Sequence, residues 1–224
     1  MFTLKPLPSQ LAPDLVQKLV RAEPATIGHF RDWGFMDPAI RAMQPDVRIA
    51  GPAVTVHQPG VDGTIIGYAL GQLRAGDVLV VDRCGDTRHA GFGGVVAYAA
   101  KVAKVAGVVI DGMVADIGEI RRYGVPVWCR GVSSITTKRI GLGGSLCIPV
   151  SCGGVAVRPG DVVIADECGV VVLDPADAEA AADRAIAMQD AEVKTRARLD
   201  AGEKLPDISG ATKVLEEALA KQRG

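Results

Sequence analysis

Apolar residues recur at helical spacing in the first part of the chain. In residues 10–22 the apolar side chains lie three and four positions apart, and Pro13 stands near the start, where a helix tolerates it. Residues 64–73, TIIGYALGQL, predict a second helix with an apolar inner face. A third helix is expected to begin at the Gly93-Gly94 turn, which precedes an alanine-rich apolar segment.

The C-terminal part of the chain is predicted to be helical. Residues 175–199 are rich in alanine, Asp174 is suited to be an N-cap, and Pro175 suits the first helical position. Gly202 is expected to end or bend this helix, and residues 211–222 predict a final one. These helices would form an extension covering about 175–224.

Between the helices, β-branched residues form short runs that predict strands. The segment 47–58, VRIAGPAVTVHQ, reads as a strand interrupted at Gly51-Pro52, and GVVID and VPVWCRG predict two further strands. From 141 to 174, apolar runs are separated by glycine with turn signals every 8 to 12 residues, which predicts several packed strands. No linker composition divides the chain, so we predict a single α/β domain over 1–224.

One turn-strand-turn segment occurs twice. RAGDVLVVDRCG at 74–85 and RPGDVVIADECG at 158–169 share Arg, Gly, Asp, Val, Asp, Cys and Gly at matching positions. One interpretation is a pair of structurally similar units in stacked sheets. The alternative is that Gly-Asp before a buried strand is common turn chemistry. One such pair falls short of a repeat architecture.

Composition narrows the classes of function. Lys and Arg number 25 against 26 Asp and Glu, and no basic run is visible, so direct nucleic-acid binding is not expected. The N-terminus lacks the pattern of a signal peptide, and no apolar run reaches the roughly 18 residues of a membrane span, so we expect a cytoplasmic protein. The five cysteines include no CxxC pair, which argues against disulfides or structural zinc, and most are expected to be buried and reduced.

The stretch 91–119, GFGGVVAYAAKVAKVAGVVIDGMVADIGE, carries the candidate chemistry. A helix that begins at its glycine turn would offer unpaired backbone N–H groups to an anion. Asp116 and Glu119 follow a buried strand and open the next helix, where carboxylates are favoured by the helix dipole. The pattern predicts a small anionic ligand held near a divalent metal.

Several motifs in and around this stretch resemble one family. They include MDPAIR, GPAVTV, AGDVLVVD, AGVVIDG, DIGEIRRYGVPVW, RGVS and PGDVVIADECGVVV, and the likeness extends over most of the chain. The chain resembles the family that contains the RraA-type regulators of RNase E and the 4-hydroxy-4-methyl-2-oxoglutarate (4-carboxy-4-hydroxy-2-oxoadipate) aldolases. The resemblance implies an RraA-like swivelling β/β/α sandwich with N- and C-terminal helices, assembled as a homotrimer or a dimer of trimers with sites at subunit interfaces.

The family's aldolases imply a reaction and a cofactor. They cleave a tertiary-alcohol oxo-acid and release pyruvate, with Mg²⁺ or Mn²⁺ polarising the 2-oxo acid. The resemblance makes Asp116 the metal anchor, with Glu119 as a catalytic acid beside it. It also makes the backbone of Gly93, Gly94, Val95 and Val96 the receptor for the substrate carboxylate.

The chain departs from the family's signature at one position. The signature is a glycine or aspartate, twenty residues, Arg-Asp, two residues and an acid, and Ala115 stands where the substrate-binding arginine belongs. Losing that arginine should cost several kcal/mol of transition-state stabilisation unless another cation replaces it.

Other residues are candidates to complete the site. Arg83, Arg88 and His89 lie in the loop before the glycine turn and could supply a cation, and Asp86 has either a loop-capping or a site role. Glu192, in the long C-terminal helix, is a candidate to reach a neighbouring subunit's metal through water, against the alternative of a solvated surface residue.

Three functions follow, in this order. The first is a divalent-metal-dependent lyase, an aldolase or decarboxylase, that acts on a hydroxy-oxo-acid with a pyruvate-like end. The second is an enzyme of the same fold whose substrate or reaction is altered by Ala115. The third is a non-catalytic RraA-type regulator that acts through a protein partner.

Overall fold

A long strand, β3 (Ile49–His57), joins the two parts of the sheet system in the computed structural model, which describes residues 1–223. The C-terminal half of β3 pairs in parallel with β4 (Val78–Asp82), and its N-terminal half pairs antiparallel with β11 (Val162–Asp166). The main sheet then continues in parallel through β6 (Gly107–Val114) to β7 (Val127–Val132). The order along this path is β1-β8-β3-β4-β6-β7-β2.

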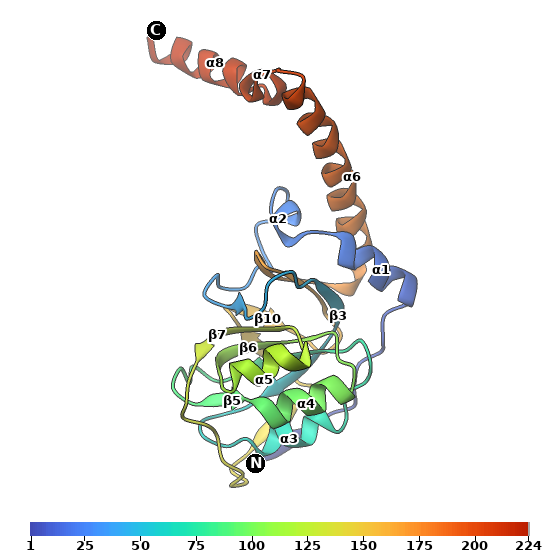
Figure 1. Ribbon diagram of the computed structural model, residues 1–224, viewed down its shortest axis with the longest axis vertical. Coiled ribbons are helices and arrows are strands. Elements are labelled where there is room, and N and C mark those ends of the chain that lie inside the picture. The colour runs from blue at the N-terminus through green and yellow to red at the C-terminus, as the bar shows by residue number, and fades with distance from the viewer. Residues whose placement is uncertain (224) are drawn as a thin grey trace.

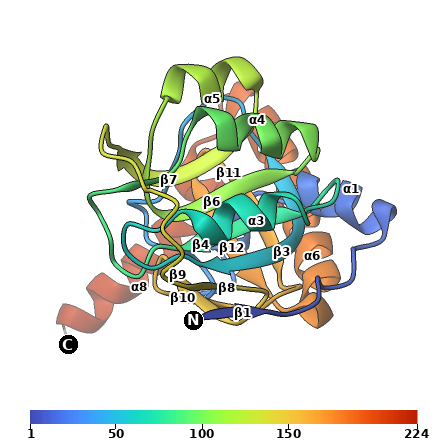
Figure 2. The same ribbon diagram turned by 90° about the horizontal axis from the view of Figure 1, so that it is seen from below.

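The remaining elements complete four layers (Figures 1 and 2). The other strands are short: β1 (Phe2–Leu4), β2 (Arg41–Ala42), β5 (Ala90–Phe92), β8 (Gly144–Leu146), β9 (Val150–Cys152), β10 (Val155–Val157) and β12 (Gly169–Leu173). The helices are α1 (Pro13–Arg21), α2 (Pro24–Ile27), α3 (Thr64–Leu70), α4 (Gly94–Val102), α5 (Ile117–Tyr123), α6 (Pro175–Asp200), α7 (Leu205–Ser209) and α8 (Ala211–Arg223).

Three apolar clusters separate the layers. The first lies between one face of the sheet and α3, α4 and α5, which Figure 2 shows on the same side. The second lies on the opposite face, where Trp128 and the alternate residues of β3, β4 and β6 pack against β9 to β12. The third lies between β11, β12 and the helices α1, α2 and α6. Alternate residues of β3, β4 and β6 enter the first and second clusters, because successive side chains of a strand point to opposite faces of the sheet. The result is the predicted β/β/α sandwich with helical ends.

β3 is continuous from Ile49 to His57, so the interruption expected at Gly51-Pro52 is wrong. β3 exchanges partners there instead: Pro52 is the last residue paired with β11 and Ala53 the first paired with β4. Proline lacks the N–H that a ladder needs, and a Cβ on Gly51 would lie 2.3 Å from the Gly76 carbonyl oxygen. The two residues therefore mark the crossing between sheets rather than the end of a strand.

The two similar segments do form matching units. In the first, Asp77 accepts a hydrogen bond from the Arg74 N–H, and in the second Asp161 accepts from the Arg158 N–H, at 2.8 and 2.7 Å. The strands that follow, β4 and β11, both pair with β3. The similarity is thus structural, and the shared Asp fixes the same turn before each strand.

The C-terminal helices extend away from the sandwich (Figure 1). Asp174 caps α6 as predicted, because its side chain accepts a hydrogen bond from the Ala176 N–H at 2.9 Å. Only the first turns of α6 are buried, through Ala178, Ala181, Ala182 and Ala185. Farther along the extension, large apolar side chains are exposed at Val193, Leu199, Leu205, Val214, Leu215 and Leu219.

Candidate functional site

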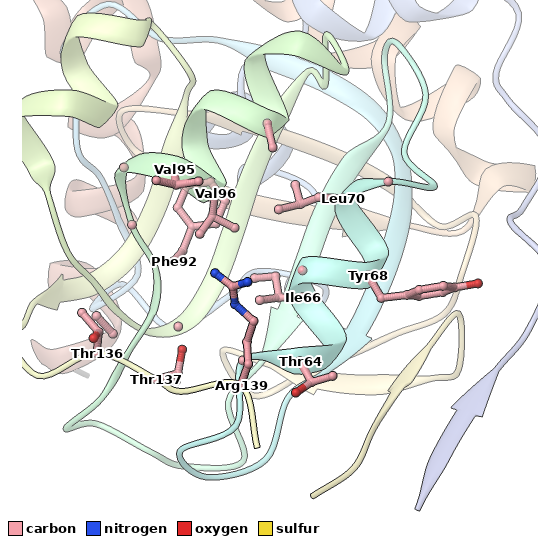
Figure 3. Close-up of a pocket in the computed structure, with 18 of the residues that line it drawn as sticks. Thr64, Ile66, Tyr68, Leu70, Phe92, Val95, Val96, Thr136, Thr137 and Arg139 are labelled. Carbon is pink, nitrogen blue, oxygen red and sulfur yellow. The ribbon is translucent and has the colours of Figure 1, made fainter. Parts of the chain in front are cut away.

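A cavity of about 1050 Å³ opens between α3, the start of α4 and the loop after β7. Its walls include α3, residues 90–96, Asp116 and the loop residues Thr136 to Arg139 (Figure 3). The carboxyl ends of parallel strands are where α/β folds place their ligand sites. The predicted glycine turn and the predicted metal anchor therefore face one cavity.

Asp116 sits where β6 gives way to α5, in a strained backbone conformation. Its φ of 53° is in the left-handed region, which is uncommon for a residue other than glycine and is concentrated at functional sites. Its side chain does not cap its own helix. Instead, Oδ2 accepts a hydrogen bond from the Gly94 N–H at 2.9 Å. The exposed carboxylate is thus fixed against the N-terminus of α4.

The glycine turn is required by the closeness of the acids. A Cβ on Gly93 would lie 2.8 Å from Asp116 Oδ2, and one on Gly94 would overlap Glu119 Oε2. The helical bonds of α4 begin with the Ala97 N–H donating to the Gly93 carbonyl. Within residues 1–223, the N–H groups of Val95 and Val96 have no protein acceptor. They remain available to an anion in the cavity.

Ala115 and Glu119 lie behind the cavity wall. Ala115 is buried, and its Cβ is 3.7 Å from the position that a Cβ on Gly93 would take. Glu119 is half-buried and covers Gly94 from the side of α5. Neither residue lines the cavity directly, but both are next to residues that do.

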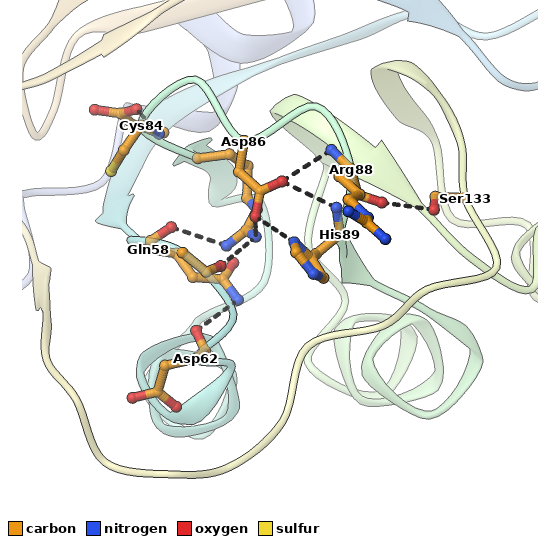
Figure 4. Close-up of polar contacts among 10 residues, drawn as sticks. Gln58, Asp62, Cys84, Asp86, Arg88, His89 and Ser133 are labelled. Atoms are coloured by element: carbon orange, nitrogen blue, oxygen red, sulfur yellow. Dashed lines mark hydrogen bonds and ion pairs between the residues drawn. The ribbon is translucent and has the colours of Figure 1, made fainter.

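The loop before the glycine turn is organised around Asp86 (Figure 4). Asp86 Oδ1 accepts hydrogen bonds from the N–H groups of Arg88 and His89 at 2.8 and 3.0 Å, and Oδ2 contacts His89 Nδ1 at 2.9 Å. Burial alone would raise the pKa of Asp86, but these hydrogen bonds lower it below its usual range. Asp86, Arg88 and His89 are not among the described residues that line the cavity.

Arg83 is buried beneath this loop. Its guanidinium donates to the carbonyls of Gln58 and Gly60 at 2.8 and 2.7 Å and pairs with Asp86 at 3.2 Å. The charge of Arg83 is therefore paired within the protein interior, with Asp86 and two backbone carbonyls. The structure does not bring this arginine to the cavity, where the sequence had suggested that it could replace the missing cation.

Glu192 lies on the exposed part of α6. Its carboxylate is 3.9 Å from Arg196 Nη1, one turn away, and it is not among the described residues that line the cavity. Within one chain it is a solvated helix residue. A role at a metal site would require a second copy of the chain.

The cavity contains two cations that sequence reasoning missed, Lys138 and Arg139. Figure 3 shows the Arg139 side chain pointing into the cavity, with its guanidinium towards Ile66, Phe92 and Val96. It forms no ion pair within the described part of the chain. In the sequence these residues are marked only as two adjacent basic residues in a polar loop. The backbone hydrogen bonds between this loop and residues 61–63 could not be predicted from the local sequence pattern.

Asp62 holds this loop in place. Its buried carboxylate accepts hydrogen bonds from Thr64 on α3 and from the N–H groups of Ile140 and Leu142, the latter at 2.6 Å. Lys138 also exchanges backbone hydrogen bonds with Val61 and Gly63. The position of Arg139 is therefore fixed by one carboxylate and a short backbone pairing.

Replacing Asp62 with asparagine is expected to loosen the loop and to lower the free energy of unfolding by about 1–3 kcal/mol, because an amide accepts fewer of these bonds. Burial opposes ionisation of Asp62, but its hydrogen bonds lower its pKa well below the usual value. The contribution of Asp62 to the free energy of unfolding should be complete above about pH 4, the pKa of an aspartate in the unfolded chain. It should decrease as the pH falls below that value. Denaturation curves of both proteins should therefore converge at acidic pH. A constant difference down to about pH 2, where the carboxylate of an unfolded chain is protonated, would contradict this account.

The comparisons with known proteins agree with this arrangement. Residues 25–172 match the family model described as RraA-like: Aldolase/RraA. The chain belongs to the RraA-like family. One RraA-like relative, named "Putative 4-hydroxy-4-methyl-2-oxoglutarate aldolase", comes from Halalkalibacterium halodurans. It is 35% identical over 162 residues, which cover 72% of this chain and 77% of the relative.

Two solved structures share the fold. RraAS2 of Streptomyces coelicolor, described as an unusual member of the RNase ES inhibitor RraA protein family, has a TM-score of 0.75 at 29% identity, covering 84% of this chain and 98% of that one. An uncharacterized Pseudomonas syringae protein has a TM-score of 0.77 at 23% identity, covering 92% and 98%. The predicted family and α/β fold are confirmed. No helix among residues 1–223 is long and apolar enough to cross a membrane.

Proposed function

We propose that this RraA-like protein is a divalent-metal-dependent carbon–carbon lyase for a hydroxy-oxo-acid with a pyruvate-like end. The observation that carries the proposal is the strained Asp116, fixed beside two unpaired N–H groups at the wall of a cavity that also holds Arg139. Relatives named as aldolases support the lyase class.

Asp116, at the cavity wall, and Glu119, behind it, suit a hard cation. Asp116 Oδ2 already accepts a hydrogen bond from the Gly94 N–H, and Glu119 provides a second carboxylate nearby. The cavity leaves room for water and substrate. Oxygen donors with open positions are what Mg²⁺ and Mn²⁺ require. Asp116, with Glu119 as the neighbouring acid, would hold the ion. When bound, it would supply Lewis-acid polarisation of the substrate's 2-oxo group.

The rest of the cavity would bind and orient the substrate. In a retro-aldol cleavage the alcohol would pass its proton to a base, and the carbon–carbon bond would break to leave a carbonyl product and the enolate of pyruvate. Protonation of the enolate carbon would then release pyruvate. The N–H groups of Val95 and Val96 would bind the carboxylate next to that group. Arg139 would bind the oxo-acid and help to neutralise the developing enolate charge, the function that the family gives to the arginine missing at Ala115. This change of cation supports an altered substrate within the same reaction class.

The direct test is release of pyruvate from branched hydroxy-oxo-acids and from oxaloacetate, with Mg²⁺ or Mn²⁺, followed by lactate dehydrogenase and NADH. The expected result is metal-dependent turnover that chelation abolishes. No turnover with any substrate, together with no divalent-metal binding by calorimetry, would reject the lyase. Capture of an RNase in that case would favour the regulator, an alternative that the similarity to RraAS2, a member of an RNase inhibitor family, supports.

Replacing Arg139 with glutamine is expected to lower kcat/KM by about 10- to 100-fold, because one charge-assisted hydrogen bond is lost. Lysine at this position should retain part of the activity. Arginine at Ala115 should restore turnover in the Arg139→Gln protein if both positions serve the same anionic group. Unchanged kinetics in Arg139→Gln would show that this arginine does not bind the substrate.

We also propose that the cavity is completed in a homotrimer or a dimer of trimers. Apolar side chains that line its open side are exposed, with Val95 84% accessible and Tyr68 and Val102 also exposed. Burying such a surface against another copy would be favourable. Sedimentation velocity should therefore show a species larger than the monomer.

A further inference from the structure

Three ligand-type side chains meet at the carboxyl ends of β3 and β4, outside the cavity. His57 ends β3 and is paired in register with Asp82, which ends β4, and Cys84 follows two residues later. His57 Nδ1 lies 3.3 Å from Asp82 Oδ2, and Cys84 Sγ lies 3.5 Å from both ring nitrogens. One ligand atom from each residue lies within 4.8 Å of the other two.

The backbone directs these side chains towards one another. Cys84 has a φ of 56°, in the left-handed region, and its N–H donates to Asp82 Oδ1 at 2.7 Å. The other carboxylate oxygen therefore faces His57. Among residues 1–223 no lysine or arginine forms an ion pair with Asp82. Its negative charge is thus available to a cation.

We propose that His57, Asp82 and Cys84 bind a transition-metal ion of the Zn²⁺ type, with a fourth position open to solvent. Imidazole nitrogen, thiolate sulfur and carboxylate oxygen are the donors that Zn²⁺ takes, and tetrahedral bonding places them roughly 3.3–3.7 Å apart. The His57–Asp82 and His57–Cys84 separations lie in this range, and one ligand atom of Cys84 and one of Asp82 lie within 4.8 Å of each other. The sulfur is equally distant from both ring nitrogens, so metal binding would require a rotation of the ring that points one nitrogen at the ion.

A nucleophilic Cys-His-Asp triad is the competing interpretation of the same residues. Cys84 is exposed, and it does not line the cavity beside α3 and α4. A bound metal ion would itself generate the Cys84 thiolate, because metal binding releases the thiol proton to solvent.

The site formed by His57, Asp82 and Cys84 offers different ligand atoms from the pair Asp116 and Glu119. Asp116 and Glu119 offer oxygen alone, which suits a hard cation, whereas the cluster adds sulfur and nitrogen. A metal there would tie the start of the Arg83–His89 loop to the end of β3. Its binding would stabilise the fold without being a step of the proposed lyase reaction.

The second turn-strand-turn unit supplies a matched control. The Cys168 N–H donates to Asp166 Oδ1 at 2.8 Å, as the Cys84 N–H does to Asp82. Both cysteines are exposed. Within the described residues, however, no histidine joins Asp166 and Cys168 in a three-ligand group. The same turn without the imidazole should bind no metal tightly.

The experiment titrates the full-length protein with Co²⁺ and follows the near-ultraviolet sulfur-to-metal band and the visible bands of tetrahedral Co²⁺. Affinity for Zn²⁺ is measured by competition with a chromogenic chelator, in the presence of excess Mg²⁺ to occupy oxygen-only sites. One equivalent should bind with both bands. Cys84→Ser should remove the sulfur band, and His57→Ala should weaken Zn²⁺ binding more than the roughly 10- to 100-fold that loss of an outer-shell partner costs.

Cys168→Ser should leave the spectrum and the affinity unchanged. The proposal would be overturned by the absence of a sulfur band in the wild-type protein, or by a band that persists in Cys84→Ser. Loss of the band in Cys168→Ser alone would also overturn it. Circular dichroism of each variant checks that a lost band does not report unfolding. Because the measurement is spectroscopic, it tests the proposed metal site independently of lyase activity.

Discussion

Replacing Asp116 with asparagine is expected to lower the rate of metal-dependent pyruvate release by at least about 10³-fold, because the proposed cation loses its charged ligand. The fold should remain intact. Asparagine has nearly the same shape, tolerates the left-handed backbone found at this position, and can still accept the hydrogen bond from the Gly94 N–H. The measurement is the coupled pyruvate assay, combined with calorimetry of Mg²⁺ or Mn²⁺ binding.

Asp46 provides a control for the chemical change itself. It is an exposed aspartate with a φ of 55°, close to that of Asp116, and it lies outside the cavity. Asp46→Asn therefore makes the same substitution on the same backbone conformation and should leave turnover and metal binding unchanged. If Asp116→Asn also behaved like the wild-type protein in an active preparation, Asp116 could not be the metal anchor.

Local sequence patterns predicted the elements that form the centre of the site. The glycine turn, the buried strand before Asp116 and the following helix are all local features, so periodicity and helix-start signals were enough to place them. The N-cap at Asp174 was predicted for the same reason. Resemblance to the family then assigned roles to these residues, and the structure places the 93–96 turn and Asp116 at one cavity.

The source of the missing positive charge could not be predicted in this way. Sequence proximity favoured Arg83 and Arg88, which precede the glycine turn by a few residues. The cation in the cavity is instead Arg139, which reaches it because Asp62 and backbone pairing hold a distant loop beside α3. Pairing between segments so far apart in the chain depends on tertiary packing, which no local period encodes. The same limit applies to β3, whose Gly51-Pro52 marks an exchange of partners that only the assembled sheets reveal.

Replacing Arg83 with methionine is expected to destabilise the protein by about 3–5 kcal/mol, the cost of breaking a buried, hydrogen-bonded charge pair by removing one partner. Methionine fills part of the space but donates nothing. The carbonyls of Gln58 and Gly60 would then lose the Arg83 donor, and the carboxylate of Asp86 would lose its charged partner. The thermal midpoint should fall by on the order of 10 °C for a protein of this size.

Arg88→Met separates this structural role from substrate binding. The Arg88 side chain is exposed, and its contacts with Asp86 and Ser133 are made by its backbone, which the substitution keeps. Its stability and its KM should both match the wild-type values. The Arg83→Met protein, assayed well below its thermal midpoint, should also keep the wild-type KM, because the proposed anion partner is Arg139. A raised KM in either variant with no change in Arg139→Gln would transfer the substrate-binding role back to the 83–89 loop.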